Sequence, residues 1–129
     1  MVITFYAGLL GLFYVFLSLN VVRGRFKNRI SLGDSGNEDM LKRIRIHGNF
    51  MEYTPIALIL IFFAEWQGAP AILIHILGTA LFLGRLMHPV GILLKDGASI
   101  GRTGGMILTL SVILIAAFTC VFGSYFSGR

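Results

Sequence analysis

The sequence predicts an all-α integral membrane protein with four transmembrane helices in one bundle domain over residues 1–129. Hydrophobic residues make up 56% of the chain and charged residues only 13%. The mean hydropathy of +0.82 is far above that of a soluble domain. Four apolar segments approach the roughly 20 residues that a helix needs to cross about 30 Å of hydrocarbon. We expect the helices at about residues 3–22, 41–66, 71–94 and 104–126.

The first and last segments are almost uniformly apolar. No Lys or Arg precedes the first one and no small-residue cleavage signature follows it, so we expect a transmembrane helix rather than a cleaved signal peptide. Cys120, the only cysteine, lies in the last segment. It excludes an intrachain disulfide and is expected to be a small buried hydrophobe.

The connections predict how the helices are joined. Gly68 and Pro70 end the second helix, and Trp66 before them fits an interfacial anchor. Because the loop that follows is short, the second and third helices should form an antiparallel hairpin. The loop before the second helix is rich in Gly, Asp and Asn, and Asn37 or Asp39 is expected to cap that helix.

The distribution of basic residues predicts the topology. They concentrate in the first loop and the helix start that follows it, and again in the third loop, whereas the second loop has none. Both basic loops should therefore be cytoplasmic and both termini outside. The net charge of +5 does not indicate nucleic acid, because the basic residues flank apolar runs without interleaved aromatics. The basic residues of the first loop, of the helix start after it and of the third loop are Arg23, Arg25, Lys27, Arg29, Lys42, Arg43, Arg45, Lys95 and Arg102.

A polar face begins the second helix. Arg45, Asn49 and Glu52 stand at i, i+4 and i+7, which places a cation, an amide and a carboxylate on one side. Charged groups at membrane depth are costly and need partners. The default interpretation is a polar site.

Other segments bring polar groups to the same membrane side. Arg85 and His88 are i, i+3 neighbours near the end of the third helix, and Arg102 and Thr103 follow in the third loop. Arg23 leaves the first helix at that side too. The group suits a small ligand with several carboxylates, because Arg binds carboxylate bidentately and an acid can take an ammonium.

Structural interpretations compete with that site. Arg85 and Glu52 could instead neutralise each other between helices, and Arg23, Arg25 and Lys27 fit lipid headgroups. We expect no metal site, since three His and few carboxylates stand at no recognised spacing. No nucleophile triad or phosphate loop is present in the sequence.

Residues 45–55, RIHGNFMEYTP, resemble the MAPEG family, the membrane-associated proteins in eicosanoid and glutathione metabolism. The family pattern is Arg-Ala-x-x-Asn-x-x-Glu followed by Tyr or a similar residue and often Pro. Gly84-Arg85-Leu86-Met87-His88 and Arg102-Thr103 look like the family's motifs near the end of the third helix and before the fourth. The resemblance covers essentially the whole chain and is greatest to the short bacterial branch.

The resemblance implies a homotrimer in a bacterial inner membrane, with glutathione bound between neighbouring subunits near the cytoplasmic face. Asn49 and Glu52 would hold the polar backbone of glutathione, with Glu52 meeting its amino group. Arg45 would line the cavity or be structural. The remaining expected site residues are Arg23, Arg85 and His88 near the carboxylates or the pocket wall, and Arg102 and Thr103 facing the sulfur.

Two functions remain open from the sequence. The first is a glutathione-dependent transferase or peroxidase for hydrophobic electrophiles or lipid hydroperoxides, in which a guanidinium or hydroxyl donor favours the thiolate. The second is a non-catalytic protein that binds a lipid or amphiphile. Gly48, Ile92 and Met106 stand where several family members have Arg, Tyr and Tyr. A small multidrug transporter is disfavoured because the first helix has no carboxylate.

Overall fold

A computed structural model describes residues 1–94 and 99–126 and contains four α-helices within them. They are α1 (Ile3–Asn28), α2 (Glu38–Trp66), α3 (Ala71–Leu94) and α4 (Ile100–Phe126). Each is long and apolar enough to cross a membrane, which confirms the predicted all-α membrane fold class. Lys95, one of the two basic residues expected in the third loop, lies outside the described residues.

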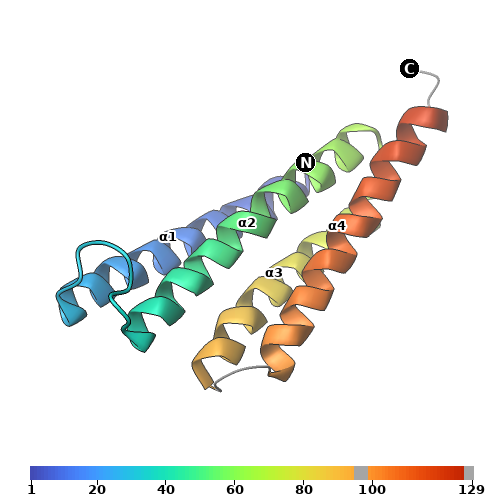
Figure 1. Ribbon diagram of the computed structural model, residues 1–129. Coiled ribbons are helices and arrows are strands. Elements are labelled where there is room, and N and C mark those ends of the chain that lie inside the picture. The colour runs from blue at the N-terminus through green and yellow to red at the C-terminus, as the bar shows by residue number, and fades with distance from the viewer. Residues whose placement is uncertain (95–98, 127–129) are drawn as a thin grey trace.

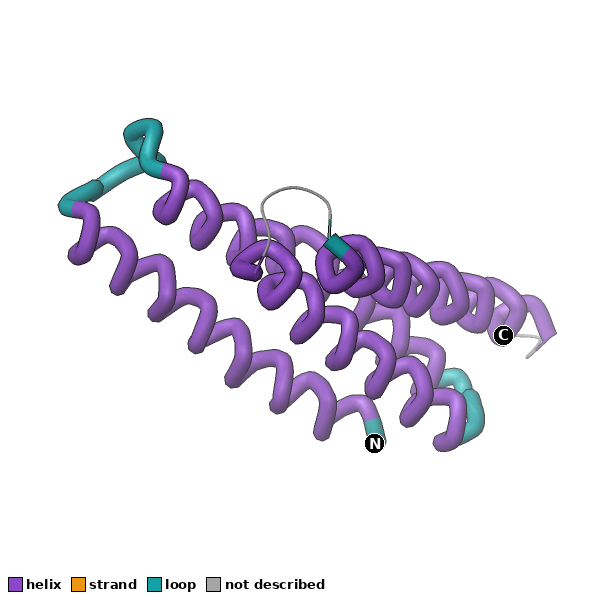
Figure 2. Tube along the Cα trace, turned by 90° about the horizontal axis from the view of Figure 1, so that it is seen from below, coloured by secondary structure: helices purple, strands orange, loops and turns teal. Residues whose placement is uncertain are grey.

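The helices form two antiparallel hairpins. In Figure 1, α1 lies beside α2 and α3 beside α4, and α2 also packs on both α3 and α4. The hairpins approach each other at the end where α1 begins and α4 ends, and they diverge toward the opposite end. Figure 2, turned by 90°, also shows the helices running along the length of the molecule.

Three helices are longer at the basic end than the apolar pattern predicts, and one of them is α4, which begins at Ile100 rather than near residue 104. The first was expected to stop near residue 22 and continues to Asn28, because a hydrophobicity boundary marks where lipid ends and not where helical hydrogen bonding ends. The second begins at Glu38 rather than near residue 41. Asn37 caps it, its side chain accepting a hydrogen bond of 2.8 Å from the Met40 N–H.

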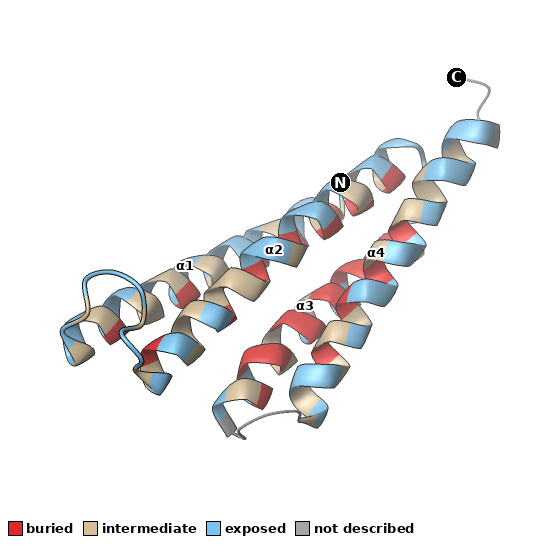
Figure 3. Ribbon diagram, viewed as in Figure 1, coloured by how far each residue is buried: buried red, intermediate tan, exposed pale blue. Residues whose placement is uncertain are grey.

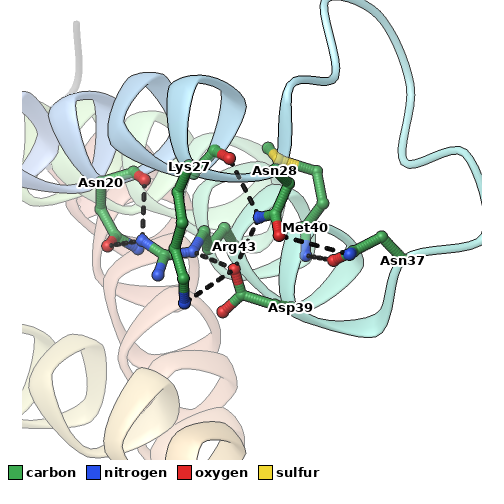
Figure 4. Close-up of polar contacts among 8 residues, drawn as sticks. Asn20, Lys27, Asn28, Asn37, Asp39, Met40 and Arg43 are labelled. Carbon is green, nitrogen blue, oxygen red and sulfur yellow. Dashed lines mark hydrogen bonds and ion pairs between the residues drawn. The ribbon is translucent and has the colours of Figure 1, made fainter.

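A polar network joins the ends of α1 and α2 (Figure 4). Arg43 Nη1 donates to the backbone oxygen and the Oδ1 of Asn20, at 3.1 and 2.6 Å. Arg43 Nε also meets Asp39 Oδ2 at 3.0 Å, and Asn28 donates to the same oxygen at 2.8 Å. Gly24 makes room for the Arg43 side chain, because a Cβ there would lie 2.4 Å from its Cδ. The network fixes the start of α2.

Glycines let α3 and α4 approach closely. A Cβ on Gly105 would lie 2.6 Å from the Gly84 oxygen and 2.9 Å from the His88 nitrogen, so only glycine fits this crossing. Ser99 supports the same end: its hydroxyl donates to the Gly91 oxygen at 2.9 Å and accepts from a backbone N–H of α4 at 3.2 Å.

Buried apolar residues line the facing sides of the helices, and exposed ones cover the outside. Figure 3 shows buried residues along much of α3 and fewer on the outer sides of the other helices. At the end away from the basic loop, Glu65 accepts the Val2 and Ile3 N–H groups at 2.5 and 2.9 Å. This carboxylate stabilises the start of α1 and anchors it to α2.

Candidate functional site

An exposed ion pair occupies the predicted polar face of α2. Arg45 Nη1 lies 3.5 Å from Glu52 Oε1, and the two side chains are 55% and 48% exposed. Gly48 lies between them, where a Cβ would stand 3.5 Å from the guanidinium and 3.9 Å from the carboxylate. Both charged groups are accessible from outside the helix.

Asn49 accepts a hydrogen bond from Arg85 on α3. Arg85 Nη1 donates to Asn49 Oδ1 at 2.8 Å, and Arg85 is only 1% exposed. Because the amide oxygen is taken by this cation, the Asn49 NH2 group remains a donor directed to other partners. Arg85 therefore positions the amide, and the alternative in which it neutralises Glu52 is replaced by the pairs Arg85–Asn49 and Arg45–Glu52.

Met106 connects this group to α4. Its sulfur accepts from Arg85 Nη2 at 3.5 Å, a weak hydrogen bond. Arg102 precedes Met106 by four residues and so shares its side of α4, and both Arg102 and Thr103 are exposed. The expected loop residues thus lie in the first turn of α4, with their side chains accessible.

Two predicted residues lie apart from the ion pair. His88 is only 4% exposed and its backbone packs against Gly105, so within one chain it belongs to the wall between α3 and α4. Arg23 is exposed on α1. At this level of α1, Asn20 hydrogen-bonds with Arg43 of α2 and Gly24 packs against the same side chain. A contact between Arg23 and a ligand on the α2 face remains a prediction that depends on a neighbouring subunit.

The accessible groups suit a zwitterion with an additional acid. A guanidinium and a carboxylate side by side can receive a carboxylate and an ammonium, and the neighbouring amide can donate a further hydrogen bond. In an environment that excludes water such charge-assisted contacts strengthen. An α-amino acid group has this pair of charges.

An apolar groove of about 380 Å³ lies between α1 and α2, and its α2 residues are on a different side of that helix from the ion pair. Thr54 lines it and is only 2% exposed, and its hydroxyl has no hydrogen-bond partner in the part of the chain that the structure describes. Pro55 has no N–H, so the Met51 carbonyl one turn earlier lacks its helical donor. The lining residues are Ala7, Leu10, Gly11, Tyr14, Phe50, Met51, Thr54, Pro55 and Leu58.

Several contributing residues could not be identified from periodicity. Met106 contacts Arg85, but a methionine in an apolar helix carries no signal of such a contact. The Arg43–Asp39 pair does have a signal in the sequence, because opposite charges at i, i+4 on a helix attract each other. Thr54 became notable only when the packing of α1 against α2 was known.

Comparison with known proteins identifies similar chains. The model of the MAPEG family matches residues 3–122. Inner membrane protein YecN of Escherichia coli strain K12 is 45% identical over 91 residues, which cover 70% of each chain. The protein of that name from Escherichia coli O6:H1 strain CFT073 has the same identity and coverage.

Proposed function

The chain belongs to the MAPEG family, and we propose on this basis that it is a glutathione-dependent transferase or peroxidase of the inner membrane. Its substrates would be hydrophobic electrophiles or lipid hydroperoxides that arrive through the bilayer. Four membrane-capable helices and similarity to an inner membrane protein support the location. The cytoplasmic position of the basic loops, with both termini outside, and the homotrimer belong to the proposal.

One observation supports this function most strongly: buried Arg85 holds Asn49 beside an accessible Arg45–Glu52 pair. The γ-glutamyl end of glutathione carries an ammonium and a carboxylate on one carbon. We assign the ammonium to Glu52, the carboxylate to Arg45, and an amide contact to Asn49. The residues present therefore fit the polar backbone of glutathione.

Arg102 and Thr103 would act on the sulfur. Bound glutathione would supply the thiolate for substitution at an electrophilic carbon with loss of its leaving group, or for cleavage of a hydroperoxide O–O bond to alcohol and water with a second glutathione as co-reductant. A free thiol has a pKa near 8.5, so at neutral pH only a few per cent is thiolate. The Arg102 guanidinium and the Thr103 hydroxyl would each favour the anion by charge or hydrogen bonding. Both side chains are exposed in the single chain. A site shared between subunits would require them to be accessible to a ligand in this way.

The groove between α1 and α2 favours a second candidate function, the binding of a lipid or amphiphile without catalysis. Its walls are apolar, and the Thr54 hydroxyl lacks a partner there. A buried hydroxyl without a partner costs about 1–3 kcal/mol. A ligand with an apolar body and one hydrogen-bonding group would remove that cost.

Conjugation of glutathione with an apolar halonitrobenzene by the purified, detergent-solubilised protein tests the first function. We expect Arg102→Ala to lower kcat/KM about tenfold, which corresponds to one unit of thiol pKa. Glu52→Gln should act mainly through a higher KM for glutathione. Glu38→Gln is the matched control, because Glu38 is also an exposed carboxylate on α2. It lies about 21 Å from Glu52 along the helix axis, at 1.5 Å per residue.

Equal activity of the wild type, Arg102→Ala and Glu52→Gln would reject the assigned site. Conjugation that never exceeds the uncatalysed rate, together with saturable binding of an amphiphile that Thr54→Val weakens, would favour the non-catalytic function.

A further inference from the structure

We propose that the end of α1 binds an anionic phospholipid, with the phosphate held by Arg25 and Arg29. A cavity of about 440 Å³ lies there, and it combines two guanidinium groups with apolar side chains. It lies on a different part of the molecule from the α2 ion pair, so it is independent of the proposed glutathione site. Its lining consists of Val22, Arg25, Phe26, Arg29, Ile30 and Ser31.

Two acidic residues near the end of α1 have partners other than Arg25 and Arg29. Asp39 is engaged by Arg43 and Lys27, at 3.0 and 3.9 Å. Asp34 accepts the Gly36 N–H at 2.9 Å. Over the described ranges, 1–94 and 99–126, neither arginine of the cavity has a carboxylate partner. Within the described residues, these two positive charges therefore have no neutralising carboxylate.

The side chain of Arg25 and the backbone of Arg29 are each fixed by a hydrogen bond. Arg25 Nη1 donates to the Gly33 oxygen at 3.2 Å, which leaves its other N–H groups for a ligand. Arg29 ends α1 in the left-handed conformation, with φ 55° and ψ 42°, and its N–H bonds to the Arg25 oxygen. Glycine or asparagine usually occupies this position of a helix end. A backbone conformation unfavourable for arginine is retained here, and it places a cation at the cavity.

An apolar strip on α1 leads to the two arginines. Leu19 and Phe26 are 61% and 82% exposed, and the spacing of the strip keeps its members on one side of the helix. Acyl chains would lie along this strip while the phosphate oxygens accept hydrogen bonds from the guanidinium groups. A free phosphate would not use the strip, so we assign the site to a phospholipid. The strip comprises Leu12, Val15, Leu19, Val22 and Phe26.

An anionic headgroup suits the site better than a zwitterionic one. A choline group would bring its own cation close to two arginines. A basic residue near an anionic leaflet contributes about 1 kcal/mol, which corresponds to about a fivefold change in binding. The structure therefore predicts a preference for phosphatidylglycerol over phosphatidylcholine that depends on Arg25 and Arg29.

Native mass spectrometry of the delipidated full-length protein tests this preference, with equimolar dioleoyl phosphatidylglycerol and dioleoyl phosphatidylcholine as probes. We expect Arg29→Gly to lower the phosphatidylglycerol preference about fivefold without loss of folding, because glycine tolerates the positive φ. Arg25→Gln should have a similar effect. Lys27→Gln is the matched control: it removes the same charge from the same helix end but from outside the cavity.

Preference lost in both arginine variants and kept in Lys27→Gln would support the site. An equal loss in Lys27→Gln would overturn it, because general surface charge would then explain the preference. Full retention in Arg29→Gly and Arg25→Gln would also overturn it. Displacement of phosphatidylglycerol by an equal concentration of glycerol phosphate would show that a free anion is the ligand and would overturn the assignment to a lipid.

Discussion

Removal of the Asn49 side chain should destabilise the protein more than removal of the arginine that holds it. In Asn49→Ala, Arg85 stays 1% exposed but loses its 2.8 Å acceptor. Its Nε already has no partner among the described residues, and the Met106 sulfur at 3.5 Å is a weak substitute. A hydrogen bond to a charged group contributes about 1.5–3 kcal/mol, so we expect a loss of about 2 kcal/mol.

Arg85→Met should lower the free energy of unfolding by less than Asn49→Ala does, by about 1 kcal/mol or below. It removes the buried charge together with its desolvation penalty, and the half-buried Asn49 keeps access to other donors. The double variant should be no less stable than Asn49→Ala, because the cost of the unpaired cation disappears. The assay is unfolding in mixed detergent with increasing dodecyl sulfate, followed by far-ultraviolet circular dichroism. A larger loss in Arg85→Met than in Asn49→Ala would refute the reasoning.

Three further predictions use the same unfolding assay. Gly105→Ala should cost about 1–3 kcal/mol because its Cβ would meet backbone atoms of α3, whereas Gly8→Ala, with open space around it, should be neutral or stabilising; equal effects would contradict the close crossing. Thr54→Val should stabilise because its hydroxyl is buried without a partner, and Thr109→Val should destabilise by about 1 kcal/mol because its hydroxyl donates at 2.8 Å; the reverse order would contradict this. Glu65→Ala should cost about 1–2 kcal/mol through loss of the α1 cap, and no change would show that water replaces the carboxylate.

Much of the fold follows from the sequence because a bilayer imposes one strong condition on it. Backbone polar groups must be satisfied within each spanning segment, so long apolar runs become helices. The ends were less predictable. α1 passes residue 22 and stops at Asn28, where left-handed Arg29 closes the helix, and arginine is not a residue that marks such an end.

The site was predictable as a face but not as a set of contacts. The i, i+4, i+7 spacing placed Arg45, Asn49 and Glu52 together, and the structure has them on one side of α2. The sequence did not determine the partner of each residue. Antiparallel packing predicts the level at which Arg85 lies along α2, but not whether its side chain points to Asn49 or to Glu52. The burial of Arg85 agrees with the rule that a charge in a membrane helix faces the bundle interior, but that rule does not say which side chain pairs with it.

Calorimetric titration of the purified wild type with glutathione, and with N-acetylated glutathione for comparison, tests the central claim most directly. The claim is that the α2 face receives an α-amino acid zwitterion, with the ammonium on Glu52. We predict saturable binding of glutathione, and at least tenfold weaker binding of the acetylated compound, because acetylation removes the ammonium and with it about 1.4 kcal/mol or more of charge-assisted binding. Equal affinities, or no binding at millimolar glutathione, would contradict the account.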